Sequence, residues 1–162
     1  MELAGRSGEF MMCSFLVVVD GSVQSSLALD RAIEIASALP ASEIVLLNVQ
    51  PELPRWQSVR PDGARIAQIS RRVLHQAEQR ARSAGITTRA MIAVGDRAET
   101  IQRVAKSEGC DHIFVSQGRI GRATRVLMKL TGLSADSDAG RLISQSDVPV
   151  TVFSERLENS SR

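Results

Sequence analysis

The residues with the clearest chemical potential follow two apolar segments of the chain. Asp20 and Gly21 come directly after the run FLVVV at 15–19, and Gly118 and Gly121 come shortly after another apolar run. Two glycines three residues apart, ahead of a helix, let backbone N–H groups face an anion. Many turns of this kind contain glycine for steric reasons alone, so phosphate binding and plain turn geometry both remain open at this point.

The elements that would position these residues alternate between two patterns. Short apolar runs rich in Val, Ile and Leu are typical of strands buried on both faces, and apolar residues at spacings of three and four indicate helices. Ser25 and Ser26 are the expected N-caps of the first helix. This alternation predicts an α/β fold, a doubly wound parallel sheet with helices on both faces. The strands are expected at 15–19, 44–49, 87–94, 112–115 and 148–153, and the helices at about 25–39, 65–84, 98–107, 119–130 and 141–145.

Ligands of such sheets bind outside the carboxyl ends of the strands, where the strand order reverses. The turns at 20–22, 49–50, 95–96 and 118–121 are therefore expected to share one edge of the sheet.

Length and composition favour a single domain. The chain has 162 residues, of which 43% are hydrophobic and only 3% aromatic, so we expect one core of aliphatic side chains. We interpret 13–154 as the domain, 155–162 as a C-terminal tail and 1–12 as an N-terminal tail, disordered or added ahead of a start at Met11 or Met12. Cys13 and Cys110 are far apart in sequence and lack metal-ligand spacing, which favours reduced thiols without a metal.

The chain shows neither an apolar run long enough to span a bilayer nor a signal-peptide pattern, so we expect a cytoplasmic protein without membrane contact.

Four motifs resemble the universal stress protein family: VVVDGS at 17–22, LLNVQP at 46–51, VSQGRIG at 115–121 and SDVPVTVF at 146–153. Their order and spacing make the resemblance specific, and it covers nearly all of 13–154. It implies a three-layer five-stranded fold of the adenine nucleotide alpha-hydrolase-like type, with strand order 3-2-1-4-5. It also implies a homodimer that pairs through the last strand, 148–153.

The same resemblance implies an adenine nucleotide, such as ATP, as the ligand, and a regulatory role in stress response. Val19, Asp20, Gly21 and Val49 would then flank the adenine and the ribose. The alternative is a family member that binds no nucleotide and acts through protein–protein contacts.

The phosphate part of the family pattern departs here from its usual form. Gly118, Arg119 and Gly121 match its first part, but Asp136 and Ser137 stand where the pattern has Gly-Ser. Ser137 remains a phosphate candidate, whereas the carboxylate of Asp136 would repel phosphates unless Mg²⁺ bridged them. The sequence therefore leaves the nature of the nucleotide open.

Catalysis is not expected beyond slow ATP hydrolysis. His75 and His112 lie within a predicted helix and a predicted strand, where histidines are more often structural, and no nucleophile elbow or Walker loop is present. Asp96 ends a strand, as the phosphoacceptor of a receiver domain does, but the other receiver residues are missing and a helix N-cap explains it better.

A set of cations recurs at helical spacing in 119–130: Arg119, Arg122, Arg125 and Lys129. They form either a solvated helix face or an anion-binding surface. Because the net charge is only +2 and no aromatic platform accompanies them, we do not expect nucleic acid as a partner.

Overall fold

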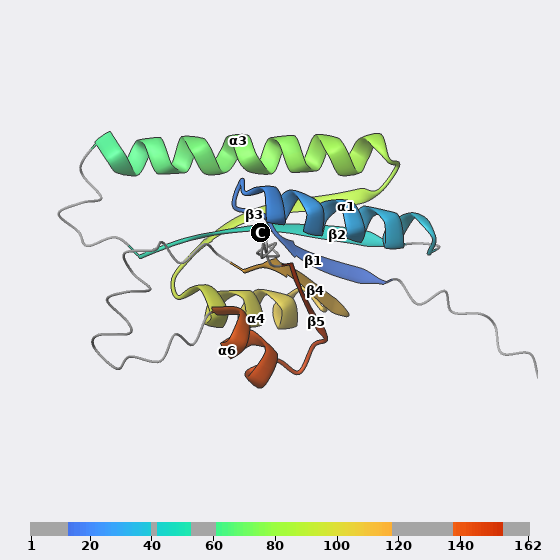
Figure 1. The fold of residues 1–162 in the computed structure, drawn as a ribbon. Helices are drawn as coiled ribbons and strands as arrows, with labels where there is room; N and C mark the ends of the chain where they lie inside the picture. The colour runs from blue at the N-terminus through green and yellow to red at the C-terminus, as the bar shows by residue number, and fades with distance from the viewer. Residues whose placement is uncertain (1–12, 40–41, 53–60, 118–137, 154–162) are drawn as a thin grey trace, which may run out of the picture.

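Five parallel strands form one sheet in the order β3-β2-β1-β4-β5 (Figure 1). The computed structural model describes residues 13–39, 42–52, 61–117 and 138–153. Both the predicted sheet and its predicted order are confirmed. The strands are β1 Ser14–Val18, β2 Glu43–Gln50, β3 Thr87–Val94, β4 His112–Ser116 and β5 Val150–Phe153.

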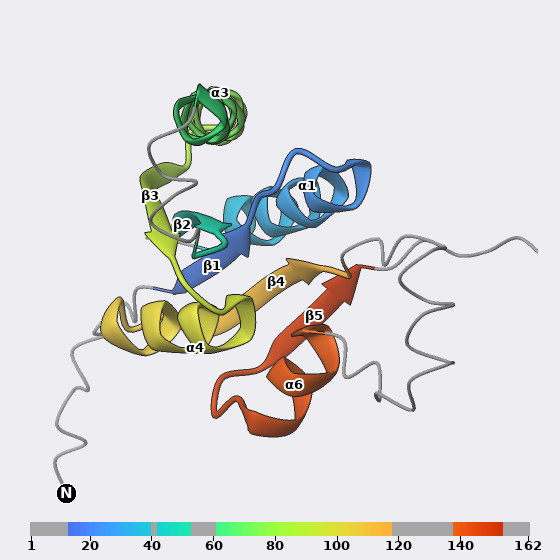
Figure 2. The ribbon, with the colours of Figure 1, turned by 90° about the vertical axis from the view of Figure 1, so that its left-hand side faces the viewer.

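The helices form a layer on each side of the sheet, α1 and α3 on one face and α4 and α6 on the other (Figure 2). They are α1 Val23–Ser37, α3 Pro61–Ser83, α4 Arg97–Ser107 and α6 Asp138–Gln145. Within the described residues, no helix is long and apolar enough to cross a membrane.

The core consists of two apolar clusters separated by the sheet. All five residues of β1 are buried, and their side chains alternate between the clusters because successive residues of a strand face opposite sides. Phe15 and Val17 pack with α1 and α3, whereas Leu16 and Val18 pack with α4 and α6. This two-sided burial explains the unbroken apolar run in the sequence.

The first helix begins earlier than its serines predicted. Its N-cap is Ser22, whose side chain accepts a hydrogen bond from the backbone N–H of Ser25 at 3.1 Å. Ser25 is itself buried, and its hydroxyl donates to the carbonyl of Ser22. The expectation that Ser25 or Ser26 caps the helix is therefore wrong, since tertiary packing draws Ser25 inward.

The other boundaries agree to within a few residues. α3 starts at Pro61 rather than 65, which fits the tolerance of a helix for proline in its first turn, and α6 starts at Asp138 rather than 141. β5 begins at Val150 rather than 148. The expected helix at 119–130 and its cationic face lie outside the described residues.

Candidate functional site

The carboxylate of Asp20 lies at the carboxyl end of β1, where the strand order reverses between β2 and β4. Its Oδ1 accepts a hydrogen bond from the backbone N–H of Ser22 at 3.0 Å. Its Oδ2 accepts one from the hydroxyl of Ser116 at 3.1 Å and lies 3.3 Å from a guanidinium nitrogen of Arg97. Asp20 thus joins the ends of β1 and β4 to the start of α4.

This environment keeps Asp20 ionised at neutral pH. Burial raises the pKa of its carboxyl, but the hydrogen bonds from Ser22 and Ser25, together with the charge of Arg97, outweigh that effect and leave the pKa below its usual value. The side chain is 26% exposed, so the carboxylate is within reach of a ligand.

The backbone around Asp20 is fixed from both sides. The buried amide of Asn48 donates to the carbonyl of Val19 at 2.7 Å, and the N–H of Val19 donates to the carbonyl of Leu47 at 2.9 Å. Gly21 follows with a φ of +81°, a conformation that favours glycine. These contacts hold the predicted Val19, Asp20 and Gly21 as one rigid turn.

A cavity of about 500 Å³ opens at the carboxyl ends of β2 and β3, next to the start of α4. Val49 and Gly95 both line it and are held close because the N–H of Gly95 donates to the carbonyl of Gln50 at 3.0 Å. Arg97, which pairs with Asp20, also lines the cavity. Of the predicted residues, Val49 therefore lines this cavity directly and Asp20 contacts it through Arg97, whereas Val19 and Gly21 line a second cavity.

Asp96 serves as the N-cap of α4, as predicted. Its Oδ1 accepts a hydrogen bond from the N–H of Glu99 at 3.0 Å, and its Oδ2 pairs with Arg141 at 3.0 Å. The hydrogen bond from Glu99, followed by that from Arg141, lowers the pKa of Asp96. With both oxygens engaged in this way, the carboxylate links α4 to α6 at the rim of the cavity.

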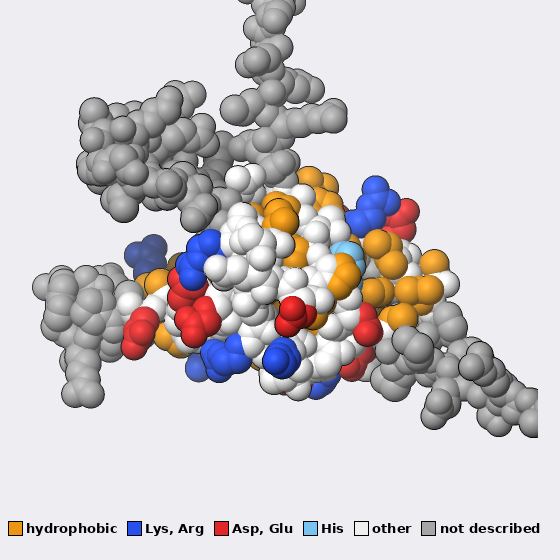
Figure 3. Space-filling view, turned by 90° about the horizontal axis from the view of Figure 1, so that it is seen from below, with side chains coloured by type: hydrophobic (Ala, Val, Ile, Leu, Met, Phe, Trp, Pro, Cys, Tyr) orange, Lys and Arg blue, Asp and Glu red, His pale blue; other side chains and the backbone are white. Residues whose placement is uncertain are grey.

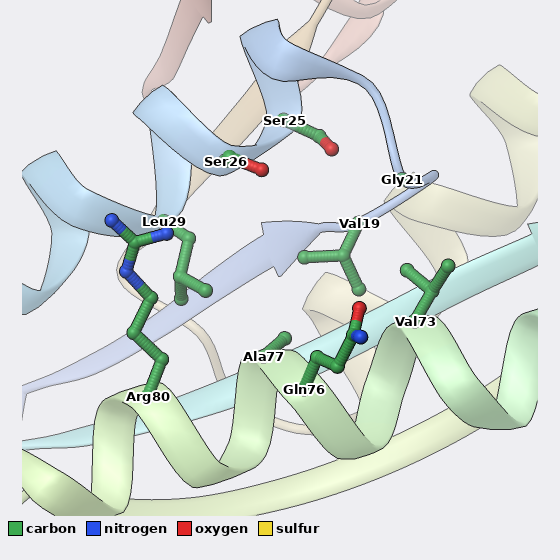
Figure 4. A pocket seen from close by; sticks show the side chains of 9 residues that line it. All are labelled: Val19, Gly21, Ser25, Ser26, Leu29, Val73, Gln76, Ala77 and Arg80. Carbon is green, nitrogen blue, oxygen red and sulfur yellow. The ribbon is translucent and has the colours of Figure 1, made fainter.

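A smaller cavity, of about 150 Å³, lies on the other face between α1 and α3 (Figure 4). The hydroxyls of Ser25 and Ser26 at its border both donate to the carbonyl of Ser22, and Arg80 pairs with Asp30 at 2.7 Å. A space of about 150 Å³ is too small for a nucleotide, so we regard it as a packing gap.

Four predicted site residues, Gly118, Arg119, Gly121 and Ser137, lie outside the described residues. Arg97 and Ser116 were not predicted, although Ser116 belongs to the motif VSQG and Arg97 follows a predicted cap. In the described part of the chain, no three His, Cys, Asp or Glu side chains are grouped as a metal site.

His112 lies away from this edge and connects β4 to β5. Its Nε2 is 2.8 Å from the hydroxyl of Thr151, and burial lowers its pKa.

The family model for the universal stress protein family matches residues 11–154. The chain belongs to the universal stress protein family. No curated protein sequence matches it.

Solved structures agree with this assignment. A universal stress protein family member from Burkholderia pseudomallei is 25% identical, with a TM-score of 0.67 over 88% of this chain and 96% of that one. One from Arabidopsis thaliana with AMP bound is 17% identical, with a TM-score of 0.61 over 92% and 96%. One from Archaeoglobus fulgidus in complex with dAMP is 16% identical, with a TM-score of 0.61 over 89% and 98%. The latter two show a shared fold.

Proposed function

We propose that this universal stress protein binds an adenine nucleotide at the edge formed by Asp20, Val49 and Arg97, and that binding serves a regulatory role in stress response. The observation that supports this most directly is the ionised, partly exposed carboxylate of Asp20 at the switch point of the sheet, beside a cavity of about 500 Å³. Cavities of roughly 300–1,000 Å³ are the usual size for small-molecule ligands.

The carboxylate retains capacity for a ligand. The side chain of Asp20 is 26% exposed, and its longest hydrogen bond, at 3.3 Å, is the one from Arg97. A ribose hydroxyl or a base N–H can replace Arg97 as a donor to this carboxylate. In this proposal the backbone of Val49 meets the adenine, and the N–H groups of 118–121, with Ser137, meet the phosphates.

Calorimetric titration with AMP, ADP, ATP and cyclic AMP, with and without Mg²⁺, tests the proposal. We expect saturable micromolar binding, weakened about tenfold by Asp20→Asn, which keeps the shape but removes the charge that strengthens a hydrogen bond. Glu34→Gln is the matched control, because Glu34 pairs with Arg31 on the exposed surface of α1 and should leave affinity unchanged.

Two results would count against the site. If none of the four nucleotides binds, the protein-contact alternative gains support. If Asp20→Asn binds as tightly as the wild type, the nucleotide lies elsewhere.

We also propose that the protein is a homodimer that pairs through 148–153, and that it is not an enzyme beyond slow ATP hydrolysis. β5 is the last strand of the sheet and has a neighbour only in β4, so its outer edge is open to pairing within the described residues. Light scattering should give twice the mass of one chain, and a monomer mass at all concentrations would contradict the dimer.

A further inference from the structure

A larger cavity, of about 660 Å³, lies between α4 and α6 on the opposite side of the molecule from the packing gap of Figure 4. It extends from Glu99 to the turn at Gly109 and Cys110, just before β4, and to Val148, just before β5. Its deep end is therefore at the amino ends of the strands, away from Asp20 and Val49. We call it the α4–α6 cavity.

The walls of the α4–α6 cavity are well held. Ala105 and Cys110 are 1% and 5% exposed and belong to the core cluster beneath it. On the opposite wall, the hydroxyl of Ser146 donates to the carbonyl of Val148 at 2.8 Å and accepts from its N–H at 3.1 Å. The N–H of Ser146 donates to the carbonyl of Leu142 at 2.9 Å, which ties this turn to α6.

One polar group on the cavity wall has no partner. The side-chain nitrogen of Gln102 is buried and is the one such atom, among the described residues, without a hydrogen bond. Buried donors without a partner are rare in folded proteins. The terminal amide torsion of glutamine has a broad minimum, so the amide of Gln102 can rotate and present this nitrogen to a ligand oxygen in the cavity.

The charges around Gln102 restrict the ligand further. Arg103 and Lys106 lie one turn apart on the same face of α4, are exposed, and form no ion pair within the described part of the chain. Glu99 and Asp147 also line the cavity, so two cations are balanced by two anions. Acidic and basic side chains are likewise interspersed on this side of the molecule (Figure 3). Arg103 and Lys106 can pair with one carboxylate, whereas Glu99 and Asp147 would repel the further charges of a polyanion such as a nucleoside triphosphate.

We propose that the α4–α6 cavity is a second ligand site, which takes a small organic acid with one carboxylate and an apolar body. The carboxylate contacts Gln102, Arg103 and Lys106, and the apolar body packs on Ala105, Cys110 and Val148. This site is independent of the nucleotide site.

Titration of the full chain with benzoate, followed by ¹H–¹⁵N NMR, tests the proposal. We expect saturable shifts of backbone amides at 102–110 and 145–148, and much weaker effects from benzyl alcohol, which has the ring without the charge. The double variant Arg103→Met, Lys106→Met should weaken benzoate binding about tenfold, because both charge-assisted contacts are lost.

The control is Arg71→Met, Arg72→Met, which removes two exposed cations from α3 on the other face of the sheet. Thermal unfolding of both double variants verifies that each is folded. Gln102→Leu should also weaken benzoate, and it leaves the net charge unchanged. Shifts that are absent, spread over the whole surface, or equally weakened by the control pair would overturn the proposal.

Discussion

Replacing Gly21 by alanine should destabilise the fold for two separable reasons. Gly21 has a φ of +81°, and a Cβ built there would lie 3.1 Å from a methyl group of Val73 on α3. The left-handed conformation destabilises the folded state of the alanine variant by about 1–2 kcal/mol. Alanine also makes the unfolded chain less flexible than glycine does, which offsets roughly 0.4–1 kcal/mol of that cost. The backbone contribution alone is therefore about 1 kcal/mol.

Gly85 provides a control for the backbone contribution. Its φ is +77°, yet a Cβ at Gly85 would meet nothing within 4 Å. Gly85→Ala should thus cost about 1 kcal/mol, and Gly21→Ala about 1 kcal/mol more because Val73 must move. For a chain of this size, the extra 1 kcal/mol corresponds to a further decrease of roughly 2–4 °C in Tm.

Urea unfolding followed by circular dichroism measures both variants, and a double-mutant cycle isolates the contact. In a Val73→Ala background the crowding methyl is gone, so Gly21→Ala should cost about the same as Gly85→Ala. If Gly21→Ala and Gly85→Ala are equally destabilising in the wild-type background, the close approach of α3 to this turn is refuted. Because Gly21 adjoins Asp20, the same variant should also weaken nucleotide binding.

Two further predictions concern the same turn. Ser22→Ala removes the N-cap of α1 and should lower the free energy of unfolding by about 1 kcal/mol in urea, whereas Ser37→Ala, at the exposed end of α1, should change it by less than about 0.5 kcal/mol. Asp20→Asn should lower stability by about 1 kcal/mol at pH 7, and this difference should vanish on acidification. The folded-state pKa of Asp20 lies below the ordinary value of 3.8, so the charged form stabilises the fold above about pH 4 and that contribution is lost as the pH falls through the folded-state pKa. A difference that does not shrink as the pH falls below about 4 would contradict the charge-based explanation.

The strands were predictable because their signals are local. β3 was predicted with its observed ends, Thr87 and Val94, since Gly85 and Gly95 bound an extended run on both sides. The start of α1 could not be predicted, because Ser22, Ser25 and Ser26 are all competent N-caps. In the structure the hydroxyl of Ser22 accepts from the N–H of Ser25, whereas those of Ser25 and Ser26 donate to the carbonyl of Ser22.

Part of the candidate site could likewise be predicted from the sequence, and part could not. Asp20 and Val49 could be predicted because strand ends on one edge of a parallel sheet must meet. Arg97 and Ser116 could not, since their contacts with Asp20 connect positions 77 and 96 residues away along the chain. No local pattern encodes the direction in which the guanidinium of Arg97 turns at the start of α4.

The unequal partners of Asp20 indicate how the site can adapt to a ligand. Ser116 is 2% exposed, so removing its acceptor would leave a buried hydroxyl without a partner, which is costly. Arg97 makes the longest of the three contacts, at 3.3 Å, and its side chain is 21% exposed, so water can replace Asp20 as its partner. The N–H of Ser22 belongs to the cap of α1 and is fixed. A ligand that donates a hydrogen bond to Asp20 will therefore displace Arg97 first, and the released guanidinium stays at the cavity wall, where it can donate to the ligand instead.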